Sequence, residues 1–156
     1  MICFIPTKGR LQTKTYKLFE EVGIEVRHFI EPQEIERYQV PNKVSILEND
    51  KGIGYVRNFM LDYARANNHE WVIMCDDDVT DFGEAINNKC ITTSAKIWNN
   101  VYSKAVKLPF DIYGLNYRQH AWHEKKNYNI NKSFVEVCIL ININNIKWKY
   151  RSEYNL

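Results

Sequence analysis

The chain places Asp76, Asp77 and Asp78 directly after a run of five apolar residues at 71–75. An apolar run without alternation predicts a strand that is buried on both faces, as in a parallel sheet. Adjacent carboxylates repel one another, and Mg²⁺ or Mn²⁺ would relieve that repulsion because both ions prefer carboxylate oxygen. The competing interpretation is a solvated acidic turn that merely ends a strand. The buried run before the acids favours the metal site.

Polar residues also follow three other apolar runs that predict strands, at 2–5, 25–30 and 43–47. Ligands of parallel α/β sheets bind outside the carboxyl ends of the strands, so these polar residues are expected to converge on one edge of the sheet. A nucleotide diphosphate with a bridging metal requires such a set, because carboxylates bind the cation while positive side chains and backbone N–H groups bind phosphate oxygens. The candidate residues at these strand ends are Pro6, Thr7, Lys8, Arg10, Glu31, Lys51 and Gly52.

The sequence Gly52-Ile53-Gly54 leads into the strongest helical pattern of the chain. Apolar residues recur there at i, i+3, i+4, i+7 and i+8, which predicts one buried stripe. The stripe consists of Val56, Phe59, Met60, Tyr63 and Ala64. A helix N-terminus is a natural anion site, and Arg57, one turn in, could form a fork to a phosphate. Taken alone, the two glycines are equally consistent with a flexible helix entry beside a solvated arginine.

The order of the expected elements predicts the fold class. Up to residue 79 the order is strand–helix–strand, a short helical turn at 33–38, and then strand–helix–strand again. This alternation indicates an open parallel α/β sheet. Thr13 is expected to cap the first helix, and Gly23 stands where its C-terminal cap belongs.

The second half of the chain predicts a mixed or antiparallel arrangement. A helix capped by Thr92 or Thr93 is expected before strands at 111–118 and 134–141. The polar stretch 119–132 between these strands predicts a loop. A last short strand is expected at 146–150, because apolar residues alternate there.

The composition indicates one folded, soluble domain in the cytoplasm, which is the host-cell cytoplasm if the protein is viral. The 156 residues, 13% of them aromatic, suit a single core, and the net charge of +2 gives no global case for nucleic-acid binding. No apolar stretch approaches the ~20 residues that span a bilayer. The four cysteines form no CxxC pair and are expected to be buried free thiols. For the HxxH of His120 and His123, solvation in a polar loop is favoured over metal ligation.

Three stretches together resemble a known family: the strand ending in Ile5-Pro6-Thr7-Lys8-Gly9-Arg10, the Gly-Ile-Gly helix with Arg57-Asn58, and the strand into Asp76-Asp77-Asp78. They look like a GT-A type glycosyltransferase, and most closely resemble the TET-associated glycosyltransferase group found with phage DNA-modification systems. The likeness is strongest over residues 1–79 and looser at 113–118. It implies a GT-A-like (Rossmann-like), mostly parallel sheet flanked by helices, with a mixed or antiparallel C-terminal part. Residues 1–156 would form one domain, with a donor half at 1–79 and an acceptor-side half at 80–156.

The resemblance also implies the ligands. A hexosyl or pentosyl group would come from a nucleotide sugar, with a UDP-sugar as the expected donor, and the acceptor would be a hydroxylated base such as 5-hydroxymethylpyrimidine in DNA. Mn²⁺ or Mg²⁺ would be held by Asp76 and Asp78, and Arg57 would lie near the phosphates or the sugar of the donor. The donor-binding set is expected to be Pro6, Thr7, Lys8, Arg10, Glu31, Gly52, Gly54, Arg57, Asp76 and Asp77.

The acceptor side departs from the family pattern. In such folds an acidic element follows the late strand and activates or binds the acceptor, whereas this sequence stops at 151–156, about where that element would begin. Three explanations stay open: a truncated or split domain, substitution by Glu153, or completion of the site by a partner chain. Asp78 and Glu153 are therefore the candidate catalytic residues.

Two other functions compete with sugar transfer. A sugar-1-phosphate nucleotidyltransferase is disfavoured because the loop after the first strand offers only Gly9, where such enzymes carry a richer glycine loop. A non-catalytic nucleotide-sugar-binding domain is the second alternative. A DNA acceptor would need a basic groove. Six basic residues could line such a groove, although solvated surface side chains are their ordinary interpretation. They are Lys125, Lys126, Lys132, Lys147, Lys149 and Arg151.

Overall fold

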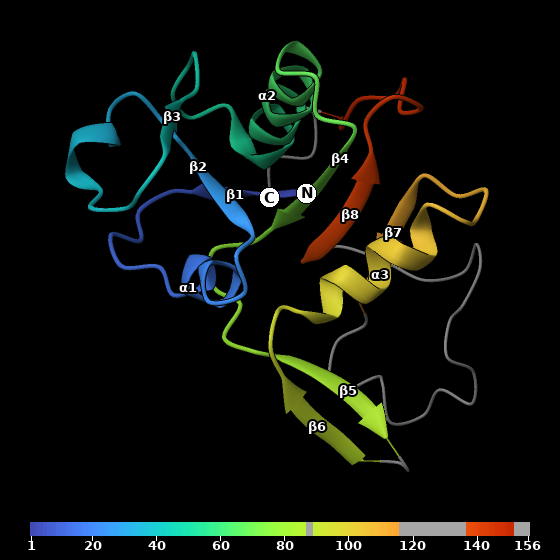
Figure 1. Ribbon diagram of the computed structural model, residues 1–156. Helices are drawn as coiled ribbons and strands as arrows, with labels where there is room; N and C mark the ends of the chain where they lie inside the picture. The colour runs from blue at the N-terminus through green and yellow to red at the C-terminus, as the bar shows by residue number, and fades with distance from the viewer. Residues whose placement is uncertain (87–88, 116–136, 152–156) are drawn as a thin grey trace.

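A computed structural model describes residues 1–86, 89–115 and 137–151. Its main feature is a six-stranded sheet of order β3-β2-β1-β4-β8-β7 (Figure 1). The first four of these strands are parallel: β3 (Lys43–Ser45), β2 (Glu25–Ile30), β1 (Ile2–Thr7) and β4 (Trp71–Cys75). β8 (Cys138–Asn142) runs antiparallel to β4, and β7 (Ile112–Gly114) antiparallel to β8. The predicted α/β class and mostly parallel sheet are confirmed, as is the antiparallel character of the later strands.

Helices cover both faces of the sheet. α2 (Gly52–Ala66) lies on one face, and α1 (Thr15–Glu20) and α3 (Ile97–Ala105) lie on the other (Figure 1). Side chains of β1 alternate between the two cores, with Phe4 packing on the α2 side and Ile5 on the side of α1 and α3. Because both faces are covered, every residue of β1 and β4 is buried. This burial explains why the run at 71–75 is apolar without alternation.

The predicted stripe of α2 is confirmed. Val56, Met60 and Ala64 are buried in the core beneath the helix. Phe59 and Tyr63 are partly buried and pack against the same core. This packing fixes the start of the helix, with Arg57 one turn in, beside the carboxyl ends of the parallel strands.

The predicted helix caps are partly wrong. α1 has its C-cap at Glu21, and Gly23 closes the turn that follows: its N–H donates to Glu20 O at 3.0 Å, and its φ of +74° favours glycine. Thr13 does not cap that helix, because Lys14 is the N-cap and provides no side-chain cap bond. Thr92 and Thr93 do not cap α3, whose N-cap is Lys96.

Thr92 and Thr93 instead belong to a hairpin that the sequence analysis missed. β5 (Phe82–Ile86) and β6 (Lys89–Thr93) form this separate two-stranded sheet, which projects away from the main sheet (Figure 1). Two-stranded hairpins are marginal on their own. This one is anchored by the buried ring of Phe82, which makes edge-to-face contacts with Phe19 and Trp98.

The last segment of the described chain corrects one further expectation. Residues 146–151 form no strand and run as irregular backbone.

The helical turn predicted at 33–38 is present as a short 3-10 helix (Ile35–Arg37). Several predicted features lie outside the described residues: the 119–132 loop with His120 and His123, the lysines Lys125, Lys126 and Lys132, and Glu153.

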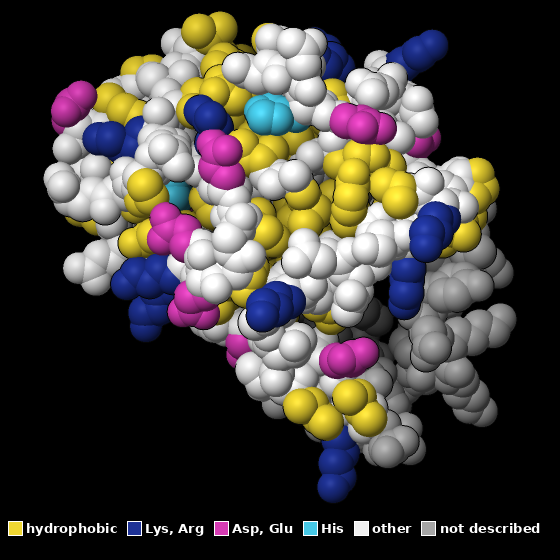
Figure 2. All heavy atoms as spheres, viewed as in Figure 1, with side chains coloured by type: hydrophobic (Ala, Val, Ile, Leu, Met, Phe, Trp, Pro, Cys, Tyr) yellow, Lys and Arg dark blue, Asp and Glu magenta, His cyan; other side chains and the backbone are white. Residues whose placement is uncertain are grey.

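Two further findings concern the sequence expectations on cysteine and membrane spans. Cys3, Cys75 and Cys138 are buried free thiols, as predicted. None of the helices in the described part of the chain is long and apolar enough to cross a bilayer. On the face shown in Figure 2, positive and negative side chains are interspersed rather than gathered by sign.

Candidate functional site

A cleft of about 440 Å³ opens at the carboxyl edge of the parallel strands. Ten of the predicted residues line it together, nine of them predicted at the strand ends and Arg57 in the helix: Pro6, Thr7, Lys8, Arg10, Glu31, Gly52, Arg57, Asp76, Asp77 and Asp78. Gly54 does not line the cleft, because it is buried within α2. The convergence arises because four parallel strands end at the same edge and α2 begins there.

The apolar wall of this cleft was not predicted. Phe29, Ile46, Ile53 and Val56 contribute it. The sequence places Phe29 and Ile46 in strand-like apolar runs, which are indistinguishable from ordinary core positions. Only Ile53 carries a sequence signal, because an apolar residue stands there between two glycines at a helix entry. In the structure this residue is 45% exposed.

Arg10 lies across the acidic end of β4. Its Nη1 atom is 2.6 Å from Asp77 Oδ1 and 2.9 Å from Asp78 Oδ2. The loop that carries it is fixed by two hydrogen bonds from backbone N–H groups to side chains: Gly9 N donates to Glu34 Oε2 at 2.9 Å, and Arg10 N donates to the Tyr38 hydroxyl at 3.0 Å. The bridge joins the ends of β1 and β4 across the mouth of the cleft.

Arg57 makes a second bridge from the opposite wall. Its Nη2 atom is 3.0 Å from Asp76 Oδ1, and its side chain is only 19% exposed. Asp76 is fixed in turn through its backbone, because its N–H donates to Val137 O at 2.8 Å. Burial raises the pKa of Asp76 above its ordinary value, Arg57 opposes that rise, and the nearby charge of Asp78 adds to it.

Glu31 is a buried carboxylate that ties three loops together. Its Oε1 atom accepts from Lys8 Nζ at 3.0 Å and from Asp50 N at 3.1 Å, while Oε2 accepts from Gln33 Nε2 at 2.8 Å. Lys8 also pairs with the Asp50 carboxylate, which raises the pKa of the lysine. Hydrogen bonds to a carboxylate from a charged lysine are among the strong ones. Glu31 therefore fixes this end of the cleft.

The chemistry of Asp76 and Asp78 fits a divalent cation. Both offer carboxylate oxygens, and the side chain of Asp78 is 58% exposed at the cleft. Burial is the main cause of the raised pKa of Asp76, and the charge of Asp78 adds to it; a bound cation would relieve this repulsion. Across residues 1–86, 89–115 and 137–151, no group of three or more acidic, histidine or cysteine side chains is arranged as a ligand set. The protein would thus supply two ligands, and Mg²⁺ sites commonly take the others from phosphate and water.

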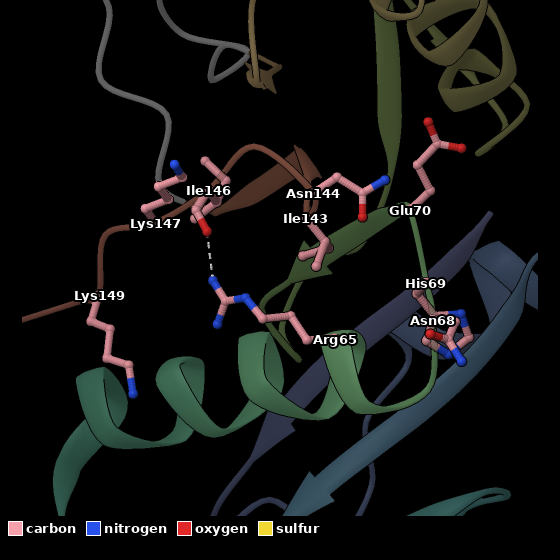
Figure 3. Close-up of a pocket in the computed structure, with 9 residues that line it drawn as sticks. All are labelled: Arg65, Asn68, His69, Glu70, Ile143, Asn144, Ile146, Lys147 and Lys149. Atoms are coloured by element: carbon pink, nitrogen blue, oxygen red, sulfur yellow. Dashed lines mark hydrogen bonds between the residues drawn. The ribbon is translucent and has the colours of Figure 1, made fainter.

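A larger hollow, of about 710 Å³, lies at the other end of α2 (Figure 3). Arg65 reaches from the helix to the carbonyl of Ile146 at 2.8 Å, and Lys147 and Lys149 also line this hollow. Among the described residues that line it, Glu70 is the only carboxylate, and none was predicted for donor binding or catalysis. The smaller cleft is therefore the candidate site.

Comparison with known proteins identifies the family of the chain. The family model of the TET-associated glycosyltransferases matches residues 1–155. The chain belongs to this family. No curated protein and no solved structure matches the chain significantly.

Membership in the TET-associated glycosyltransferases points to sugar transfer, and a glycosyltransferase of this kind would use a nucleotide-sugar donor. The match spans both the strand ends that form the cleft and the later strands β7 and β8. The family suspected from three short stretches is confirmed over nearly the whole chain.

Proposed function

We propose that this protein transfers a sugar from a nucleotide-sugar donor, with a UDP-sugar as the expected one, to a hydroxyl acceptor, with Mn²⁺ or Mg²⁺ held by Asp76 and Asp78. The observation that carries the proposal is the pair of arginine–carboxylate bridges, Arg57–Asp76 and Arg10–Asp77/Asp78, inside one cleft at the strand ends. Carboxylates bind divalent cations and arginines bind phosphate oxygens, so the residues of the cleft include both kinds of group that a metal–diphosphate complex needs.

The apolar wall gives the donor an orientation. Ile53, which is 45% exposed, offers an apolar surface on which a flat base can pack, whereas Phe29 and Ile46 are almost fully buried in the same wall. Glu31 and Lys8 supply polar groups in this cleft. Arg57 stands one turn into α2, and the N-terminus of the helix before it adds positive potential. We therefore place the base near Ile53 and the diphosphate between Arg57 and the acidic strand end.

The reaction breaks the bond between the sugar and the terminal phosphate oxygen, so negative charge develops on the departing diphosphate. Arg57, fixed on the helix, stabilises that charge because it needs no reorganisation when the bond breaks. A bound divalent cation would add Lewis-acid stabilisation of the same leaving group. Asp78 would hold the cation at the exposed side of the cleft, which is the role assigned to it here.

The acceptor proposed here is a hydroxymethylated base in DNA, as expected from the resemblance to phage DNA-modification enzymes. Its hydroxyl must lose a proton as the new glycosidic bond forms, and a carboxylate within hydrogen-bond reach would accept it in an inverting reaction. Glu153 remains the candidate for this base.

Calorimetry tests the donor and metal parts together. UDP-glucose and UDP are titrated with and without Mn²⁺ into the wild type, Asp78→Ala, and the control Asp81→Ala, which changes an exposed acid outside the cleft. We expect Mn²⁺ to tighten binding at least tenfold in the wild type and the control, and to have little effect in Asp78→Ala. Equal, metal-independent binding by all three proteins would refute the metal bridge. Release of pyrophosphate from UTP and glucose-1-phosphate would instead show a nucleotidyltransferase.

A further inference from the structure

The irregular segment 146–151 is bound along α2 by side chains of that helix. Asn58 forms a two-way bond with the backbone of Tyr150: its Nδ2 donates to Tyr150 O at 2.9 Å, and its Oδ1 accepts from Tyr150 N at 2.7 Å. Two helical turns further along α2, Arg65 Nη2 donates to Ile146 O at 2.8 Å. A segment without ladder bonds is thereby held in one register on the helix.

This register brings the ring of Tyr150 to Arg57, the neighbour of Asn58 in α2. The guanidinium carbon of Arg57 lies 5.6 Å from the ring centroid, within the range of a cation–π contact. Tyr150 is partly buried, and burial raises the pKa of its hydroxyl; the charge of Arg57 opposes that rise, and the charge of Asp76 adds to it. Tyr150 therefore stands beside the Arg57–Asp76 pair, although 93 and 74 residues separate it from these partners in the sequence.

An arginine side chain has many rotamers, and ordering it carries an entropic cost that a binding site must meet. Asp76 restrains the guanidinium at one edge through the 3.0 Å contact. An aromatic face beside the guanidinium restrains it from another direction and remains in place if Asp76 turns toward a cation. The ring would thus preserve the position of Arg57 when the ion pair loosens.

We propose that Tyr150 is a positioning residue of the donor site, and that its ring holds the Arg57 guanidinium in the cleft for the donor diphosphate. The proposal rests on the function proposed above. It assigns to the C-terminal segment a part in donor binding, and it makes Asn58 the residue that sets the ring in register.

The first experiment follows Arg57 itself. The order parameter of its Nε–Hε group is measured by ¹⁵N relaxation in the wild type, Tyr150→Phe and Tyr150→Leu, in the presence of Mg²⁺, so that Asp76 can turn toward the cation. We expect a value near the ~0.85 of rigid groups in the first two proteins and below ~0.6 in Tyr150→Leu, because only leucine removes the ring. An unchanged value in Tyr150→Leu would overturn the proposal. If that variant does not fold, Tyr150→Met provides the same comparison with a flexible side chain.

The second experiment is a double-mutant cycle on UDP affinity in the presence of Mn²⁺. Tyr150→Leu should weaken UDP binding roughly threefold to tenfold in the wild-type background and leave it unchanged in Arg57→Met, because the ring acts through Arg57. Tyr16→Leu serves as the matched control, since it removes a tyrosine ring that packs in the core cluster of α1 and α3. Equal weakening in both backgrounds would show that the ring does not act through Arg57.

The outcomes separate the two proposals. Absence of UDP binding by the wild type would overturn the donor site and with it the donor role of Tyr150, whereas the relaxation data would still decide whether Tyr150 holds Arg57. Binding of UDP with no effect of Tyr150→Leu would leave the donor site standing and overturn only the positioning role.

Discussion

Arg10 and Asp78 are joined at 2.9 Å, and the same Arg10 nitrogen lies 2.6 Å from Asp77. The guanidinium of Arg10 therefore pairs with the carboxylate of Asp78, which we propose as a metal ligand. Asp78 is more than half exposed, so this contact is screened by water and easily exchanged. Arg10 would stabilise the acidic strand end until a cation replaces it.

Loss of Arg10 should make the cation bind more tightly in the absence of nucleotide. In Arg10→Gln the carboxylate of Asp78 has no guanidinium to displace, so we expect Mn²⁺ to bind more tightly, by up to about fivefold, which is the upper end of what an exposed ion pair contributes. Electron paramagnetic resonance of free Mn²⁺ measures this directly. Arg27→Gln, which removes an arginine paired with Glu25, is the control and should leave Mn²⁺ affinity unchanged. Weaker Mn²⁺ binding by Arg10→Gln would contradict a competition at Asp78.

The buried charge of Asp77 should make stability depend on pH. Burial raises its pKa despite the opposing effect of Arg10. A carboxyl whose pKa is higher in the folded state contributes stability that is complete below its unfolded pKa, of about 3.9, and is lost as pH rises through the folded value. Asp77→Asn should therefore have a higher Tm than the wild type at pH 7, and the difference should vanish as pH falls below about 3.9.

Arg10 loses one partner in this variant, but it is half-exposed and stays solvated, so the loss is small. Thermal melts from pH 3 to pH 8 provide the measurement. Asp81→Asn, at an exposed position, should show no such pH-dependent difference. A Tm of Asp77→Asn below that of the wild type at pH 7 would refute the argument.

Several features of the site follow from local sequence, and others do not. The acidic end of β4 and the loop after β1 were predictable, because an apolar run followed by polar residues marks a strand end and parallel strands end at one edge. The contact of Tyr150 with Arg57 was not, because it joins an irregular segment to a helix across 93 residues. Alternating apolar residues at 146–150 even predicted a strand there.

The remaining failures have similar causes. Thr92 is as suitable for a helix cap as for a strand, and only its pairing with Gly83 decides between them. Phe29 carries a strand pattern whether it faces the core or the cleft. The pairing of Arg10 with Asp77 and Asp78, rather than with a ligand, depends on side-chain geometry that no sequence pattern specifies.

Glu31→Gln should destabilise the fold. The glutamate accepts bonds from Lys8, from the backbone of Asp50 and from Gln33, whereas glutamine has one acceptor oxygen and turns an NH₂ group toward a donor. Loss of a buried, charge-assisted network costs about 1.5–3 kcal/mol. Urea unfolding measures the change, with Glu36→Gln at an exposed position as the control. A loss below ~0.5 kcal/mol would show that the three loops are held by other contacts.

Gly9 and Gly23 form a matched pair for separating stability from binding. Both have positive φ, +69° and +74°, and an added Cβ would meet nothing within 4 Å at either position. Alanine should therefore cost about 1–2 kcal/mol at each site, from backbone conformation alone. Gly9 lies in the loop that carries Arg10 and donates to Glu34, whereas Gly23 closes the turn after α1, away from the cleft.

The two variants should thus lose similar free energies of unfolding in urea, but only Gly9→Ala should weaken UDP binding in the presence of Mn²⁺, roughly threefold or more, because a shift of the loop moves Arg10 and Lys8. Calorimetry at a temperature where both variants are folded gives the comparison. Wild-type UDP affinity in both variants would show that the β1–α1 loop takes no part in donor binding. Equal weakening in both would mean that general loss of stability, and not the position of Arg10, controls the site.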